Sequence, residues 1–283
     1  MDIKTMQDTP PWDWPTDAGK RVQEVLTDRR ANKSERQAAA ELAGSLVVMN
    51  DALAGCLTAI VGSPDEPARL RAQAAVSLGP VLEQADLDGF EDPDDVPITQ
   101  STFRNIQDTL QKLHSDESVP KEVRRRILEA SVRAPESWHQ KAIMAAYSSG
   151  DREWVLTAVF AMRWVRGFNE QILESLKNPD PEIHCEAVEA AGNWELAAAW
   201  PHVVEIVRDA RSPKPLLLAA IGAVGSIRPE EAGRILVDLT HSHDEEIAEA
   251  ANETIDMAEG GSGAEDEEDE EEEEEEEDEE WIN

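Results

Sequence analysis

The sequence predicts an all-α protein: a right-handed α-solenoid of about six or seven helix pairs, followed by a disordered acidic tail. Three observations predict this fold class. Apolar residues recur at i, i+3, i+4 and i+7, without strand-like alternation. Proline- and glycine-containing breakers separate short helical segments. A small-residue-rich helix recurs with a period near 31 residues, which is typical of stacked repeats because one helix pair cannot bury its apolar stripe alone.

The chain is expected to begin with a separate segment, residues 1–15. It is acidic and rich in proline, and it lacks the apolar core of a secretory signal. Pro10 to Pro15 places Trp12 and Trp14 in a stretch whose prolines exclude helix. This segment either caps the exposed apolar end of the first repeat or serves as a linear motif for a partner.

Residues 16–258 are expected to form the solenoid. Asp65 and Asp180 are predicted to cap helices, and Pro181 and Pro229 suit a first helical turn. The breakers that divide the helices are Gly62-Ser63-Pro64, Ser118-Val119-Pro120, Ala134-Pro135, Asn178-Pro179-Asp180-Pro181, Ser212-Pro213 and Arg228-Pro229.

One helical segment recurs six times along this region. The copies begin at Leu70, Val123, Trp154, Ile183, Leu216 and Ile247, and the copy at Val123 is the weakest. An acidic insertion around Asp86 to Pro97 lengthens the first spacing. Short side chains at the fifth position of a copy allow neighbouring helices to approach closely. These fifth residues are Ala74, Ile127, Ala158, Ala187, Ala220 and Ala251.

The repeat resembles the HEAT repeat in its short form, typical of phycobilisome-lyase-type proteins. The best matches are Pro179 to Ile183 followed by Ala187 and Gly192, and Ser63 to Asp65 followed by Leu70 and Arg71. The resemblance covers about residues 35–258 and extends to bacterial HEAT proteins of unassigned function. It implies an armadillo-like superhelix that serves as a protein-binding surface.

The acidic residues are concentrated at the C-terminal end. Glu265 to Glu280 are all Asp or Glu, after a Gly/Ser linker and before Trp281-Ile282-Asn283. Because such a run repels itself and buries nothing, residues 259–283 are expected to be disordered. Trp281 and Ile282 are the candidate tail motif: an apolar tip that inserts into a partner while the acids steer it towards a basic surface. The alternative is a solubilising tail.

Charge and length exclude several classes of protein. The net charge is −35, and a chain so acidic repels nucleic-acid backbones and anionic membrane surfaces. No apolar run approaches the length that spans a bilayer. The two cysteines, Cys56 and Cys185, do not form a disulfide framework. We therefore expect a cytoplasmic protein.

No catalytic or metal-binding set is predicted, and no cofactor. Deoxyhypusine hydroxylase, a HEAT relative, holds iron with His-Glu dipeptides, and this sequence has none. His241-Ser242-His243 is interpreted as a turn in which Asp244 caps the next helix. Asp86 to Asp95 lacks the ligand spacing of an EF-hand. Cys185 is expected to be a small core residue beside His184.

The most basic segment is residues 121–133. Val123, Ile127, Ala130 and Ala134 form its predicted core stripe. Its other face is interpreted as a solvent face with Glu122–Arg126 and Glu129–Arg133 pairs. The alternative is a docking site for an acidic partner, to which Arg124, Arg125, Arg152, Arg163 and Arg166 would contribute.

Eight of the thirteen aromatic residues lie within residues 138–200. They are either buried between repeats or exposed as a binding patch beside Arg163 and Arg166. The candidate partner-binding residues are Arg124, Arg125, Trp154, Phe160, Arg163, Trp164 and Arg166.

The predicted function is therefore a non-catalytic scaffold or adaptor that binds a protein or peptide, with the tail supplying steering or self-occlusion. One alternative is a HEAT-type enzyme of the bilin-lyase or oxygenase-like kind. A second is an acidic chaperone or nucleic-acid mimic that acts through its tail on a basic partner.

Overall fold

A computed structural model describes residues 1–92 and 95–260. Every regular element in these ranges is an α-helix or a 3-10 helix. The chain divides into two compact units, Met1–Val165 and Arg166–Asn283, and each is described by itself. The expected all-helical class is therefore confirmed for the described part of the chain.

The first unit contains the α-helices from α1 to α10. They are α1 (Ile3–Gln7), α2 (Ala18–Thr27), α3 (Lys33–Leu42), α4 (Asp51–Gly62), α5 (Ala68–Val76), α6 (Gly79–Asp88), α7 (Gln100–Ser115), α8 (Lys121–Ser131), α9 (Ser137–Tyr147) and α10 (Arg152–Ala161).

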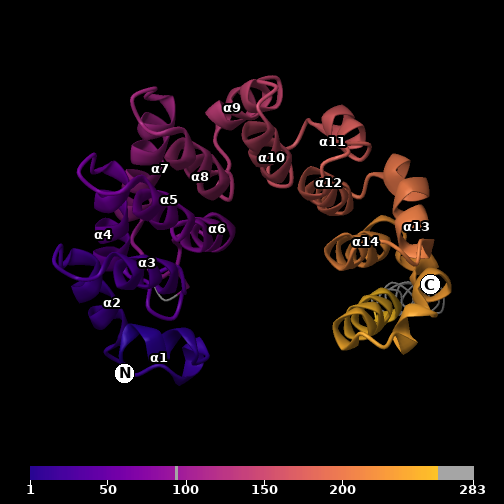
Figure 1. Ribbon diagram of the computed structural model, residues 1–283, viewed down its shortest axis with the longest axis horizontal. Helices are drawn as coiled ribbons and strands as arrows, with labels where there is room; N and C mark the ends of the chain where they lie inside the picture. Colours follow the sequence, from indigo (N-terminus) through magenta and orange to yellow (C-terminus); the bar gives the residue numbers. More distant parts are fainter. Residues whose placement is uncertain (93–94, 261–283) are drawn as a thin grey trace, which may run out of the picture. The chain divides into compact units, whose positions relative to one another are not determined.

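These helices pack as pairs in two layers. The pairs are α2 with α3, α4 with α5, α7 with α8, and α9 with α10. Figure 1 shows α2, α4 and α7 stacked as one layer, and α3, α5 and α8 as the second. α10 continues the second layer by packing on α8, and α1 covers α3. The core lies between the layers, where each helix buries its apolar stripe.

The second unit repeats the same arrangement. Its helices are α11 (Asn169–Ser175), α12 (Pro181–Asn193), α13 (Trp200–Arg208), α14 (Lys214–Ile227), α15 (Ala232–Leu236) and a last helix over residues 245–260. α11 pairs with α12 and α13 with α14, and α12 packs along α14. A 3-10 turn, η4 (Leu239–His241), precedes the last helix.

The small residues at the fifth position of each copy lie where neighbouring helices meet. All six are fully buried. Five are alanines, and a short side chain lets α5, α12 or α14 approach the next helix closely. The sequence period of about 31 residues therefore corresponds to the recurrence of buried contacts between neighbouring helices.

A second periodic feature links neighbouring repeats through polar groups. Lys121 Nζ lies 2.7 Å from Asp151, and Lys214 Nζ lies 2.6 Å from Asp244. Each lysine is the first residue of a second-layer helix, and each aspartate lies 30 residues later, at the start of the next such helix. Each of these pairs connects the start of one helix to the start of the equivalent helix in the next repeat.

An arginine at the fourth position of three second-layer helices is hydrogen-bonded to the first-layer helix of the same repeat. Arg36, Arg71 and Arg124 each donate from Nε to the carbonyl ten residues earlier, at distances of 2.8 to 3.1 Å. That carbonyl lies at the end of the preceding first-layer helix or one residue before it, where backbone acceptors lack helical partners. A cation at a helix C-terminus also complements the macrodipole.

One of the two expected aspartate caps is wrong, and the other is confirmed. Asp65 does not cap a helix. Pro67 disfavours the helical conformation at Glu66, the residue before it, so α5 begins only at Ala68. Asp180 does cap α12, accepting hydrogen bonds from the N–H groups of Glu182 and Ile183. The last helix extends to residue 260.

The N-terminal segment contains short helical turns, although its prolines were expected to exclude helix. Residues 3–7 form α1, and Pro11–Asp13 form a 3-10 turn, so the stretch is not free of helical geometry. Trp14 packs against the core and donates from Nε1 to the carbonyl oxygens of Met6 and Thr9. Trp12 is exposed. Trp14 therefore has the contacts of a capping residue, whereas Trp12 does not.

Candidate binding surface

Arg124 and Trp154, both predicted to contact a partner, contact each other. The Arg124 guanidinium lies 5.7 Å from the centre of the Trp154 ring, while its Nε bonds the His114 carbonyl at 2.9 Å. Both side chains are half-buried. The two residues join α8 to α10, so their contacts fasten neighbouring repeats.

Arg125, a candidate for contact with a partner, is buried. Its Nε donates to Thr157 Oγ1 at 3.0 Å, and its guanidinium lies 3.2 Å from Glu153 and 3.8 Å from Glu129. The side chain is 8% exposed. Arg125 lies on the side of α8 that faces α10, and its long side chain reaches the Glu153 carboxylate of the next repeat.

The expected pairs on α8 are also replaced. Arg126 pairs with Glu129, three residues away. Arg133 pairs with Glu83 of α6 at 2.6 Å. The predicted core stripe of Val123, Ile127, Ala130 and Ala134 is confirmed, since all four are buried. The helical spacing thus defined the buried stripe, but it could not reveal partners on another helix.

The remaining aromatic candidates stack on arginines. Arg133 lies 4.8 Å from the Trp164 ring centre, and Arg163 lies 5.7 Å from that of Phe160. In the second unit, Arg166 lies 5.0 Å from Trp194. Phe160, Arg163 and Trp164 are half-buried, and Arg166 is exposed. Arginine–aromatic pairs 30 or 31 residues apart, as in Arg133–Trp164, connect neighbouring repeats.

Two histidines are enclosed beside this region. Burial, with a smaller effect of the Arg124 charge, lowers the pKa of His114 to about 4. Burial likewise lowers the pKa of His139 to about 4, with a smaller effect of His114. The Glu136 N–H donates to His139 Nδ1, so Nε2 carries the proton and donates to Ser131 Oγ at 3.0 Å. His139 is therefore a neutral capping residue of α9.

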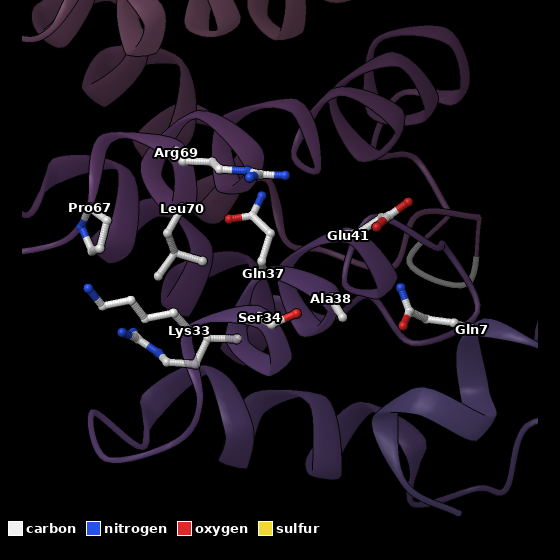
Figure 2. Close-up of a pocket in the computed structure, with 10 residues that line it drawn as sticks. Gln7, Lys33, Ser34, Gln37, Ala38, Glu41, Pro67, Arg69 and Leu70 are labelled. Atoms are coloured by element: carbon white, nitrogen blue, oxygen red, sulfur yellow. The ribbon is translucent and has the colours of Figure 1, made fainter.

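A groove of about 510 Å³ lies in the first unit, between α3 and α5. Figure 2 shows Gln7 and Glu41 at one end and Lys33, Pro67 and Arg69 towards the other. Ala38 and Leu70 add apolar surface. A concave surface with apolar walls and a few polar groups is the usual form of a binding site.

Two cations of this groove are free to bind a ligand. Lys33 and Arg69 are exposed, and neither has an ion pair or hydrogen-bond partner among the described residues. Arg36, in contrast, is held by Glu66 at 2.7 Å and by the Leu26 carbonyl. Gln37 Nε2 lies 3.5 Å from Gln73 Oε1 of the next repeat. The groove thus offers positive charge and amide groups side by side.

Sequence reasoning missed this surface. Residues 33–42 form a further copy of the repeated helix, but Glu35 stands where the other copies have an apolar first residue. A signal was present in Arg36, which occupies the same position as Arg71 and Arg124.

A second groove, of about 940 Å³, lies between α14 and the last helix of the second unit. Its lining includes Glu230, Arg234 and Glu259, with the exposed Met257. Arg234 is already paired with Glu231. This groove therefore lacks the unpaired cations of the first one.

Other predicted features have plain structural roles or lie outside the described residues. Asp244 accepts hydrogen bonds from the backbone of Glu246 and Ile247, which confirms the cap after His241-Ser242-His243. Cys185 is half-buried, with Sγ 3.6 Å from the Pro215 carbonyl oxygen. Trp281 and Ile282 lie beyond residue 260, outside the described part of the chain.

Within residues 1–92 and 95–260, no cluster of three or more His, Cys, Asp or Glu side chains has a geometry suited to a metal ion. No helix in the same ranges has both the length and the apolar character to cross a membrane.

No known protein family matches the sequence, and no curated protein is similar to it at a significant level. Among solved structures, the Escherichia coli protein YibA is 16% identical with a TM-score of 0.44, covering 87% of this chain and 84% of its own. Human deoxyhypusine hydroxylase, in complex with glycerol, is 15% identical with a TM-score of 0.40, covering 91% and 88%. An engineered protein is 17% identical with a TM-score of 0.35, covering 87% and 98%.

Proposed function

We propose that this chain is a cytoplasmic HEAT-type repeat scaffold that binds a protein partner through the groove between α3 and α5, without catalysing a reaction. Two features support the HEAT assignment: paired helices in two layers, and inter-repeat contacts at intervals of about 30 residues. The binding role is carried by one observation, the groove whose Lys33 and Arg69 are unpaired in the described chain.

The partner segment is extended and acidic. Lys33 and Arg69 lie towards one end of the groove, where they would pair with carboxylates of the ligand. Gln37 would hydrogen-bond its backbone, and the half-buried Ala38 would contact an apolar side chain. The overall negative charge of the chain makes this local positive charge selective, because an acidic ligand is repelled elsewhere.

A charge-reversal experiment tests this proposal. Full-length protein is used as bait in a native lysate, as wild type, as the double variant Lys33→Glu/Arg69→Glu, and as the control Lys141→Glu. Lys141 is exposed on α9, outside the groove, and has no ion pair in the described ranges. We expect the wild type and the control to retain one common partner that the double variant loses. Equal recovery by all three baits, or no specific partner for any, would refute the proposal.

A further inference from the structure

Two histidines of the second unit face each other across neighbouring repeats. His184 lies on α12 and His202 on α13, and their Nε2 atoms are 2.7 Å apart. The ring centres are 4.9 Å apart with the planes at 49°. Both side chains are half-buried, so solvent reaches them while the helices hold their positions. Neither residue takes part in the groove described above.

The pKa values of both imidazoles are lowered from the ordinary histidine value. Burial lowers the pKa of His184, and the neighbouring His202 lowers it further. Burial also lowers the pKa of His202, where Glu205 acts in the opposite direction and Lys177 in the same one. One ring then carries its proton on Nε2 and donates it to the Nε2 lone pair of the other.

We propose that His184 and His202 form a chelating site for a late transition-metal ion of the Cu²⁺, Ni²⁺ or Zn²⁺ class. Two imidazoles bound to one ion at 2.0–2.1 Å, with an angle of 90–109° at the metal, place their nitrogens about 2.8–3.4 Å apart. The observed 2.7 Å is about a tenth of an ångström shorter than the lower limit of this range. Small side-chain rotations would therefore open the pair enough to admit the ion.

The proton balance of binding is simple. The ring that carries hydrogen on Nε2 changes to the Nδ1–H tautomer, so both Nε2 lone pairs face the ion. When two neutral rings bind the ion in this way, no net proton is released.

The site would remain open. No third metal-binding side chain joins the two histidines among the residues that the structure describes, so water or a group from a partner would fill the other positions. Imidazole ligands favour Cu²⁺ over Ni²⁺ and Zn²⁺, and they do not suit Mg²⁺ or Ca²⁺. Metal binding would join α12 to α13 and stabilise the second unit.

The test uses full-length protein without a histidine tag, titrated calorimetrically with Cu²⁺, Zn²⁺ and Mg²⁺. The variants are His184→Gln, His202→Gln and the control His241→Gln/His243→Gln, which removes the exposed histidines near η4. We expect one Cu²⁺ or Zn²⁺ to bind the wild type and the control with equal affinity, and Mg²⁺ to show no binding that depends on these histidines. Each single variant of the pair should bind at least about tenfold more weakly, since losing even an outer-shell partner costs that much.

Thermal unfolding provides a second readout. Zn²⁺ should raise the melting temperature of the wild type and the control, but not that of His184→Gln or His202→Gln. Melting without metal shows that both variants are folded. Undiminished binding in both variants of the pair, or loss of binding only in the His241→Gln/His243→Gln control, would overturn the proposal.

Discussion

Arg36 illustrates how the fold accommodates a charged group in its interior. Its guanidinium makes two bonds to Glu66, at 2.7 and 3.0 Å, and two to the Leu26 carbonyl. Both charged side chains are only 9% exposed. The pair joins α3 to the turn before α5. All four bonds come from the planar guanidinium group, whose several N–H donors have a fixed geometry.

Replacing Arg36 should therefore destabilise the first unit strongly. Arg36→Ala leaves the Glu66 carboxylate buried without its main partner, and we expect a loss of about 3–5 kcal/mol in the free energy of unfolding. Arg30→Ala removes an exposed arginine and should change stability by less than about 0.5 kcal/mol. Urea denaturation measures both, and a similar effect for the two variants would contradict this interpretation.

The buried histidines should make stability depend on pH. The pKa values of His114 and His139 are lowered to about 4 in the folded state, whereas the unfolded values are near 6.5. Between these values the unfolded chain binds more protons, so the free energy of unfolding falls as the pH decreases from 6.5 to 4. Each histidine contributes up to about 3 kcal/mol to this fall.

A histidine variant tests the pH dependence directly. His139→Gln is less stable at pH 7 because it loses a cap, but its stability should change less between pH 6.5 and pH 4 than that of the wild type. Chemical denaturation at several pH values gives this slope. An unchanged slope would show that His139 titrates normally in the folded protein.

At the scale of elements, close helix packing explains where glycine is required. A Cβ atom added at Gly192 of α12 would lie 3.0 Å from the Cα and Cβ atoms of Ala223 on α14. A Cβ atom at Gly222 of α14 would meet nothing within 4 Å. Both glycines lie within helices, so the two differ in packing.

These two glycines should respond in opposite directions to alanine. Gly192→Ala forces α12 and α14 apart, and we expect a loss of about 1–3 kcal/mol. Gly222→Ala has space for the methyl group and should gain about 0.5–1 kcal/mol, because alanine favours helix. Thermal and urea unfolding measure both variants. Destabilisation by Gly222→Ala would mean that the repeats pack differently there.

Most of the elements follow from sequence, and the failures have physical reasons. Copies with alanine at the fifth position, such as Ala187 and Ala220, were recognised because close packing limits that site to small residues. The copy on α3 is not predicted from sequence, because its first position holds the exposed Glu35 where the other copies have an apolar residue. Asp65 has the side chain of a helix cap, but Pro67 disfavours helix at Glu66 and moves the start of α5 to Ala68.

The candidate site was much less predictable. The basic composition of residues 121–133 indicated Arg124 and Arg125 as binding residues. In the structure, Arg124 is bonded to a carbonyl, and Arg125 to a hydroxyl and a carboxylate, on other helices. Lys33 and Arg69, which are unpaired in the described chain, lie in a less basic stretch. Which cations are free depends on contacts between helices far apart in sequence, and a single sequence does not contain that information.

At the scale of the whole molecule, the central claim is that the α3–α5 groove is where a partner binds. Site-specific photo-crosslinking tests it most directly. A photoreactive phenylalanine analogue is placed at Ser34, which lines the groove, or at Ser137, an equally exposed serine in the first turn of α9. Both proteins are full-length and are irradiated in native lysate.

We predict a single crosslinked partner from position 34, absent from position 137, with an acidic segment at the crosslinked site. The crosslink should disappear when Lys33→Glu/Arg69→Glu is added, because the electrostatic contribution to binding is reversed. Identical products from both positions, or a crosslink at position 34 that survives the charge reversal, would contradict a binding role for this groove.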